Sequence, residues 1–310
     1  SNLRNLATAH ASYEAEWADR QFTLINDNFS QYGSNPDEAW SEYNNIHDTG
    51  TGHPWFMYGC SQGNACYITT NPTFHVPYDW DDDFGAFRMT NAKQLGQYIS
   101  GRFYDPIYYA PKDVAAVEAV SVSQDYPGEF DPTHSVYAPS YARSPAGMYQ
   151  PDVFAREDKG GYTNPFDLAA GHRSPAAGQA RFPDLKTKIN EHSWLQNRFT
   201  GTEFCNPNFS GGMYDGCEPY YFNHGFSSNS MTLFYDGHIE GLGQLEAMSA
   251  TDKNMATVGE GLWSTDTPLD GEWGGSSGGY FAEVRSDWTH SSHHILTMEG
   301  IRGRDKTADG

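Results

Sequence analysis

The sequence predicts an α+β fold in which a helix comes first and most strands come in the last third of the chain. Leu3, Leu6, His10, Tyr13 and Trp17 recur at steps of three or four residues, which places them on one face of a helix. After residue 220 the pattern changes to short strand-like runs, namely YYFNHG, SMTLFY, HIEGL, YFAEVRSD and HHILTMEGI. No period of about 20 to 50 residues repeats along the chain.

We therefore expect one helix over 1–20 and a single head domain over 21–310. The chain contains 32 Gly and 17 Pro, which indicates many turns. Long irregular insertions are expected over about 30–220. Within them, short helices are predicted over 90–101, over 113–122 and over 182–197.

Composition supports a packed core and an acidic surface. Hydrophobic residues make up 37% of the 310 residues and aromatic residues 15%, which argues against general disorder. The formal net charge is -21 although only 19% of residues are charged. Such a balance suits a soluble exported protein and argues against nucleic-acid binding, which needs a basic footprint.

Four cysteines occur as two close pairs, and neither pair has C-x-x-C spacing. Three pairings are open, of which the local bridges Cys60–Cys66 and Cys205–Cys217 are the simplest. Each of these bridges would staple a Gly/Asn-rich loop and would indicate an oxidising compartment. Four buried free thiols are the alternative.

No membrane span is predicted, because no run of about 18 apolar residues occurs. No signal peptide is predicted either, because no hydrophobic leader precedes the first helix. The first residues already belong to the amphipathic helix. Either the helix starts there, or an upstream part has been removed.

The stretch MTLFYDGHIEGL predicts a β-hairpin with Asp236-Gly237 at its tip. Asp-Gly between apolar runs favours a two-residue type I′ turn, in which both central residues have positive φ. In that register Phe234 lies opposite Ile239 and packs against it, and His238 lies on the other face. A catalytic or metal role for Asp236 and His238 is the alternative, and it needs partners that this stretch does not supply.

The acidic run YDWDDDFGAF raises the question of calcium. Asp79, Asp81 and Asp83 alternate as in the first part of an EF-hand loop. Phe84 then stands where the sharp turn needs Gly, and Thr90 stands where a bidentate Glu belongs, which argues against an EF-hand. A looser calcium site and a solvated acidic loop remain the two interpretations.

No catalytic residue is predicted. The stretch GGSSGG contains Gly-x-Ser-x-Gly through Ser276 and Ser277, but the flanking pattern favours a flexible turn over a nucleophile elbow. His290, His293 and His294 are interpreted as surface or packed histidines, with a metal site as the alternative. Nucleotide-binding and zinc-protease motifs are absent. A hydrolase that uses Asp and His remains the alternative to a non-catalytic protein.

Two stretches resemble a known family. SNLRNLATAHASYEAEW resembles the segment after the membrane helix in bacterial type II secretion and type IV pilus-like prepilins, also called pseudopilins. FNHGFSSNSMTLFYDGHIEG resembles the C-terminal signature of one branch, in which a His precedes an apolar strand and Asp-Gly. The spacing is wider here, because eleven residues (225 to 235) separate His224 from Asp236. The matching residues are His224, Leu233, Phe234, Asp236, Gly237 and His238.

The resemblance implies a long N-terminal helix packed on an antiparallel sheet, with a structural role for the hairpin and its flanking histidines. It further implies a structural subunit that assembles into, or associates with, a bacterial cell-surface or secretion filament. The expected partners are other copies of the chain or other pilin-like subunits. The expected location is extracellular, at the cell surface or in the periplasm. Membrane contact would come only through an apolar helix that precedes residue 1.

A glycan-binding surface module is the second interpretation. Many aromatic residues lie in Gly/Asn/Asp-rich stretches, and aromatic rings next to carboxylates suit sugar rings and calcium. The candidate platform residues are Trp55, Trp80, Tyr108 and Tyr109. The alternative is that these rings pack the interior of a loop-rich head.

Overall fold

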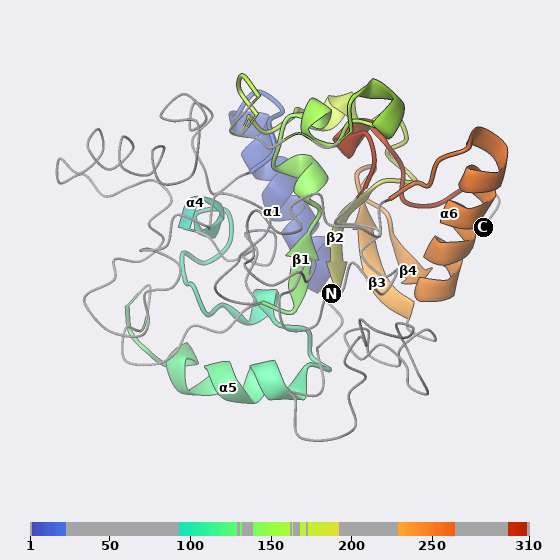
Figure 1. Ribbon diagram of the computed structural model, residues 1–310. Coiled ribbons are helices and arrows are strands. Elements are labelled where there is room, and N and C mark those ends of the chain that lie inside the picture. The colour runs from blue at the N-terminus through green and yellow to red at the C-terminus, as the bar shows by residue number, and fades with distance from the viewer. Residues whose placement is uncertain are drawn as a thin grey trace, which may run out of the picture.

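The protein combines helices with an antiparallel sheet, which confirms the mixed α and β class (Figure 1). The computed structural model places the helix α1 at the start of the chain and the sheet behind it in sequence order. The described residues are 2–22, 93–128, 131, 139–161, 163, 168–171, 173–191, 229–263 and 297–308.

Four strands form one sheet in the order β1-β2-β3-β4, and every neighbouring pair is antiparallel. All residues of β1 are buried, and so are the first four residues of β2. The sheet therefore has side chains packed on both faces at β1 and β2. The strands are β1 (Tyr141–Arg143), β2 (Thr187–Glu191), β3 (Asn229–Phe234) and β4 (Ile239–Gly243).

The predicted N-terminal helix is confirmed as α1 (Asn2–Glu16). Its buried side chains are Leu3, Leu6, Ala9, His10 and Glu14, which recur at the helical period. The helix contacts β3 and the turn η4 (Pro106–Tyr108).

The other helices are short or lie at the periphery of the sheet. α4 (Lys93–Gly96) covers four residues of the helix predicted over 90–101. α5 (Val114–Gln124) confirms the helix predicted over 113–122. The Asp113 side chain accepts a hydrogen bond from the Ala116 N–H and so caps the start of α5.

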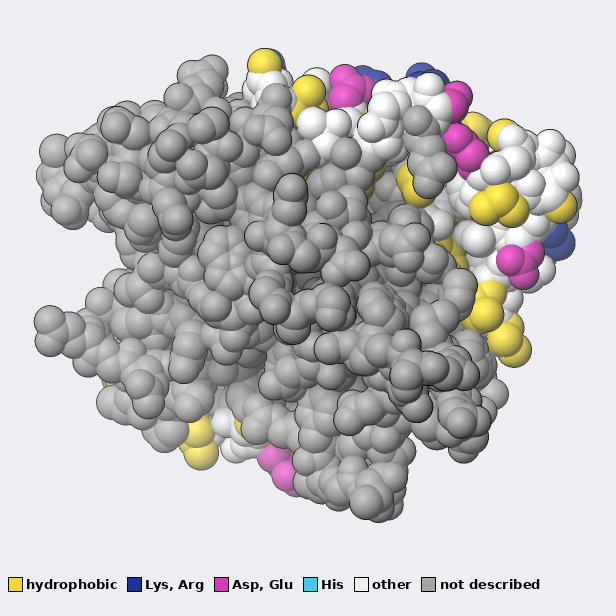
Figure 2. Space-filling view, in the orientation of Figure 1, with side chains coloured by type: hydrophobic (Ala, Val, Ile, Leu, Met, Phe, Trp, Pro, Cys, Tyr) yellow, Lys and Arg dark blue, Asp and Glu magenta, His cyan; other side chains and the backbone are white. Residues whose placement is uncertain are grey.

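The helix α6 (Gln244–Val258) follows β4 directly and lies outside the predicted elements. It ends at Gly259, whose φ of 86° is the left-handed conformation that glycine adopts most easily. Over α6, Figure 2 shows apolar side chains at the surface, and Leu245, Met255 and Val258 are more than half exposed.

Short 3-10 turns connect many of these elements, and three of them begin with proline, whose fixed φ suits the first helical position. The turns are η4, η5 (Pro145–Gly147), η6 (Pro151–Val153), η7 (Glu157–Lys159), η8 (Ala177–Gln179) and η11 (Gly300–Arg302).

Among the described residues no helix is both long and apolar enough to cross a lipid bilayer.

The helix predicted over 182–197 is wrong, because residues 187–191 form the central strand β2. Lysines normally face solvent, but Lys188 on β2 and Lys186, directly before β2, are both buried here. Asp305 and Glu14, which lie 119 and 174 residues away in the sequence, supply their partners. Because both carboxylates are distant in the sequence, no local pattern predicts that these lysines lie in a buried strand segment.

The strand predicted in HHILTMEGI is also wrong over its described residues. Thr297 makes only an isolated bridge to Trp263, and the chain then turns through η11. Beyond η11, Asp305 and Lys306 hold the end of the described chain to the sheet.

Candidate functional site

The hairpin predicted at Asp236-Gly237 is confirmed, but its turn type and register are wrong. Gly237 has a φ of 90°, whereas Asp236 does not have positive φ. Leu233 pairs with Ile239, and Phe234 donates its N–H to the His238 carbonyl at 3.0 Å. The loop therefore has three residues, with glycine alone in the left-handed position, and is not a two-residue type I′ turn.

The extra loop residue moves the side chains to new neighbours. Phe234 is fully buried and stacks on the His238 ring, with 4.4 Å between ring centroids and an interplanar angle of 1°. Phe234 therefore packs on His238, and the predicted contact between Phe234 and Ile239 is replaced by the pair Leu233–Ile239.

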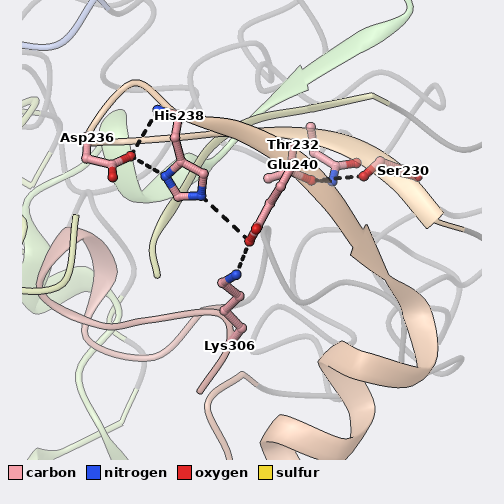
Figure 3. Close-up of polar contacts among 7 residues, drawn as sticks. Ser230, Thr232, Asp236, His238, Glu240 and Lys306 are labelled. Carbon is pink, nitrogen blue, oxygen red and sulfur yellow. Dashed lines mark hydrogen bonds and ion pairs between the residues drawn. The ribbon is translucent and has the colours of Figure 1, made fainter. Parts of the chain in front are cut away.

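Asp236 organises the turn that it occupies. Its Oδ1 accepts a hydrogen bond from the His238 N–H at 3.0 Å and lies 2.5 Å from Nδ1 of the same histidine (Figure 3). This is the local side-chain-to-backbone pattern typical of Asp at position i of a turn. The carboxylate therefore fixes both the loop and the orientation of the imidazole.

The other side of His238 faces a carboxylate and a lysine. Nε2 lies 3.6 Å from Oε1 of Glu240, and Glu240 in turn contacts the ammonium of Lys306 (Figure 3). Partial burial lowers the pKa of Lys306, although Asp184 and Asp236 oppose this effect. We call Asp236, His238, Glu240 and Lys306 the hairpin network.

The hairpin network consists of ion-pair contacts that join His238 and Lys306 to carboxylates. A histidine that activates a nucleophile has a hydroxyl or thiol at its second nitrogen. In the hairpin network Nε2 of His238 faces Glu240 instead. Lys306 also lies over the Phe234 ring, 5.1 Å from its centroid, and so ties the end of the described chain to the hairpin.

No group of three or more His, Cys, Asp or Glu side chains suited to a metal ion occurs among the residues that the structure describes.

A second polar cluster joins α1 to the sheet in the interior. Nζ of Lys188 on β2 lies 2.5 Å from Oε1 of Glu14, and the two side chains are 9% and 11% exposed. Arg143 on β1 donates to the Phe22 carbonyl, and its Cζ lies 4.4 Å from the centroid of the Phe22 ring. Burial lowers the pKa of Lys188 and lowers that of Arg143 to about 10.

A groove of about 530 Å³ runs along α1 on the side of residues 98–107. Amide, hydroxyl and carboxyl groups line it, from Asn5, Thr8, Ser100 and Asp105.

Aromatic rings meet at the Tyr98 side of this groove. The Trp17 indole is stacked on Tyr13, with 5.6 Å between centroids, and its N–H donates to the Tyr98 hydroxyl at 3.2 Å. Tyr98 lines the groove and donates to Glu16 at 2.7 Å. Trp17 is 53% exposed, so this aromatic group faces solvent.

The structure corrects the glycan platform predicted at Tyr108 and Tyr109. These two side chains are 1% and 2% exposed, so their rings pack in the interior and offer no face to a sugar. Burial raises the pKa of the Tyr109 hydroxyl well above its usual value. The packing alternative therefore accounts for both residues.

Several predicted site residues lie outside the described part of the chain. They are Trp55 and Trp80, the acidic residues Asp79, Asp81 and Asp83, the cysteines Cys60, Cys66, Cys205 and Cys217, and the histidines His224, His290, His293 and His294. Ser276 and Ser277 also lie outside it.

Sequence reasoning missed Glu240, Lys306 and the pair Glu14–Lys188. Glu240 could have been found, because it follows His238 by two residues at the start of β4 (Ile239–Gly243), and alternate residues of an extended chain share a face. No local pattern marks the others.

Comparisons with protein-family models, with curated proteins and with solved structures found no match for this chain.

Proposed function

We propose that this chain is a non-catalytic, pilin-like subunit that assembles into, or associates with, a bacterial cell-surface or secretion filament. In support of this proposal, the described elements follow the order that the resemblance implies, with the helix α1 first, the sheet later and an Asp-Gly hairpin between β3 and β4. Its partners are then further copies of the chain or other pilin-like subunits.

The observation that carries the proposal is the division of α1 into two faces. The inner face is buried, and the Glu14–Lys188 ion pair fixes it to β2. The outer face is exposed and, apart from Arg4, carries small or short side chains that let another helix approach closely. The outer residues are Arg4, Thr8, Ala11, Ser12 and Ala15.

The hairpin network supports a structural role for the family-like signature. The Asp236 carboxylate accepts the His238 N–H and so shapes the loop. The His238 ring lies between the carboxylates of Asp236 and Glu240 and stacks on Phe234. Residues of the signature thereby stabilise the last hairpin and attach the segment around Lys306 to it.

Site-specific photocrosslinking tests the proposal. A photoreactive amino acid replaces Ala11 on the outer face of α1, in cells that produce the protein from its natural gene. Irradiation is expected to give a ladder of covalent multimers. The matched control replaces Ser249, a small residue that is exposed on α6 and lies off the proposed contact face. A ladder from Ser249 but none from Ala11 would contradict the proposal.

The groove along α1 favours a glycan-binding head as the second candidate function. Amide, hydroxyl and carboxyl groups beside an exposed aromatic cluster match the hydroxyls and the apolar faces of a sugar. A glycan array probed with the whole chain, with and without calcium, tests this function. Trp17→Ala and Asn5→Ala should abolish any binding, whereas Leu245→Ala on α6 should retain it. Binding that survives both groove variants would place the glycan site elsewhere.

A further inference from the structure

His10 lies in the interior between α1 and the sheet, held by packing and not by hydrogen bonds. It is 0% exposed, and neither ring nitrogen has a hydrogen-bond partner in the described part of the chain. The imidazole meets the Phe22 ring edge-on, with 6.1 Å between centroids, and the Arg143 guanidinium lies over the same Phe22 ring. Such a site accommodates a neutral imidazole far better than a charged one.

Cations surround His10 on the side of the sheet. Arg143 extends from β1 and Lys188 from β2, and both raise the electrostatic potential at the imidazole. The buried carboxylate of the cluster is Glu14, one turn further along α1, and Lys188 already neutralises it at 2.5 Å.

Among the residues that the structure describes, the other titratable groups near this cluster do not offer a free counter-charge. Asp19, just after α1, is exposed and acts on Lys188 from outside. Tyr13 on α1 and Tyr235 in the hairpin loop stand near Arg143, and burial raises the pKa of Tyr235, which keeps that hydroxyl neutral. Protonation of His10 would therefore add a third positive charge to a cluster whose one described buried carboxylate, Glu14, is already paired with Lys188.

We propose that protonation of His10 releases α1 from the sheet, so that the helix–sheet contact works as an acid-sensitive latch. The sheet itself does not depend on this cluster, because strand pairing, the Lys186–Asp305 ion pair and the Asn190–Thr232 hydrogen bond hold it together. The latch is independent of the filament role, since it requires only the helix–sheet contact.

The direction of the pH dependence follows from linkage. Burial, followed by the charges of Arg143 and Lys188, lowers the pKa of His10 well below its ordinary value of 6.5. Below that value the released helix binds more protons than the docked one. The contribution of neutral His10 to docking is thus complete above about pH 6.5 and is lost as the pH falls.

Hydrogen exchange read by mass spectrometry on the whole chain tests the latch. Exchange is compared at about pH 7.5 and about pH 5, with the intrinsic rates corrected. Peptides from α1 should exchange at least about tenfold faster in acid, while peptides from 229–243 keep their protection. His10→Gln, which cannot be protonated, should remove the acid response. The matched control His238→Gln, at an exposed histidine, should leave it intact.

Three outcomes would overturn the latch. They are unchanged protection of α1 in acid, an undiminished acid response in His10→Gln, and simultaneous loss of protection in α1 and 229–243. If His10→Gln does not fold, NMR titration of the histidine side chains in the natural chain decides. A His10 ring, identified by its contact with Phe22, should stay neutral down to the pH at which α1 is released. An ordinary midpoint near about 6.5 with α1 still docked would contradict the proposal.

Discussion

The neighbouring residues Asp305 and Lys306 hold the same segment to the sheet, each through one ion pair. The pair made by Asp305 is buried, and the pair made by Lys306 is partly exposed. Asp305 binds Lys186 at 3.0 Å, and both side chains are 0% exposed. Lys306 contacts Glu240, and these side chains are 14% and 39% exposed. Water can replace either partner of the outer pair but neither partner of the inner one. The comparison predicts that burial, and not the number of ion pairs, decides which contacts hold the fold.

The largest effect is expected from Asp305→Ala. The change removes the acceptor of the Lys186 ammonium and of the Thr187 N–H, and it leaves a buried charge unpaired. We expect the free energy of unfolding to fall by about 3 to 5 kcal/mol. Lys306→Ala is the matched control, with a loss below about 1 kcal/mol. Urea unfolding followed by circular dichroism measures both, and equal losses would break the comparison.

Glu14→Gln extends the comparison to the contact between α1 and β2. It leaves Lys188 buried without a counter-charge, and we expect a loss of about 2 to 4 kcal/mol. Lys188→Met in the same chain should recover at least about 1 kcal/mol of that loss, because it removes the orphaned charge. Glu16→Gln, at an exposed position of the same helix, should change stability by less than about 1 kcal/mol. Additive effects of the Glu14 and Lys188 changes would show that the pair is not coupled.

Asp113→Asn tests a buried carboxylate whose pKa is not lowered by any cation among the described residues. Burial raises the pKa of Asp113 to about 6, against the hydrogen bonds from Ser140 and Ala116. The folded state therefore binds more protons than the unfolded state between about pH 4 and 6, and stability falls as the pH rises through that window.

Asparagine removes this penalty. The stability of Asp113→Asn relative to the natural chain should thus increase by about 2 to 3 kcal/mol between pH 4 and pH 8. Thermal unfolding in a series of buffers measures the difference. A constant difference across the series would contradict the raised pKa.

Local signals explain the parts of the fold that the sequence predicts correctly. The spacing of Leu3, Leu6 and His10 is enough to specify α1, because neighbours on a helix face are neighbours in sequence. Asp236-Gly237 is enough to specify the hairpin, although not the number of loop residues. The difference between a two-residue and a three-residue loop depends on whether Phe234 packs on His238, and that is a tertiary contact.

The parts that escape prediction depend on partners far away in the sequence. From its local sequence Lys188 is expected to face solvent. Its partner Glu14 lies beside it in the structure but 174 residues away in the sequence. Lys306 joins the hairpin network from 66 residues beyond Glu240. His10 follows the apolar stripe of α1, but nothing local indicates that Arg143 would become its neighbour. A charge in the interior is predictable only together with its partner.

Substitutions at the hairpin tip should have the smallest effects, because the tip is exposed. Gly237→Ala meets no atom within 4 Å, so its only penalty is the left-handed φ of 90°, about 1 kcal/mol. Asp236→Asn keeps an oxygen that accepts the His238 N–H and loses only a charge that water already screens. We expect a change below about 0.5 kcal/mol, measured by urea unfolding beside Gly237→Ala. If Asp236→Asn proved more destabilising than Gly237→Ala, the carboxylate charge would matter at the surface as it does inside, and the contrast between the two settings would fail.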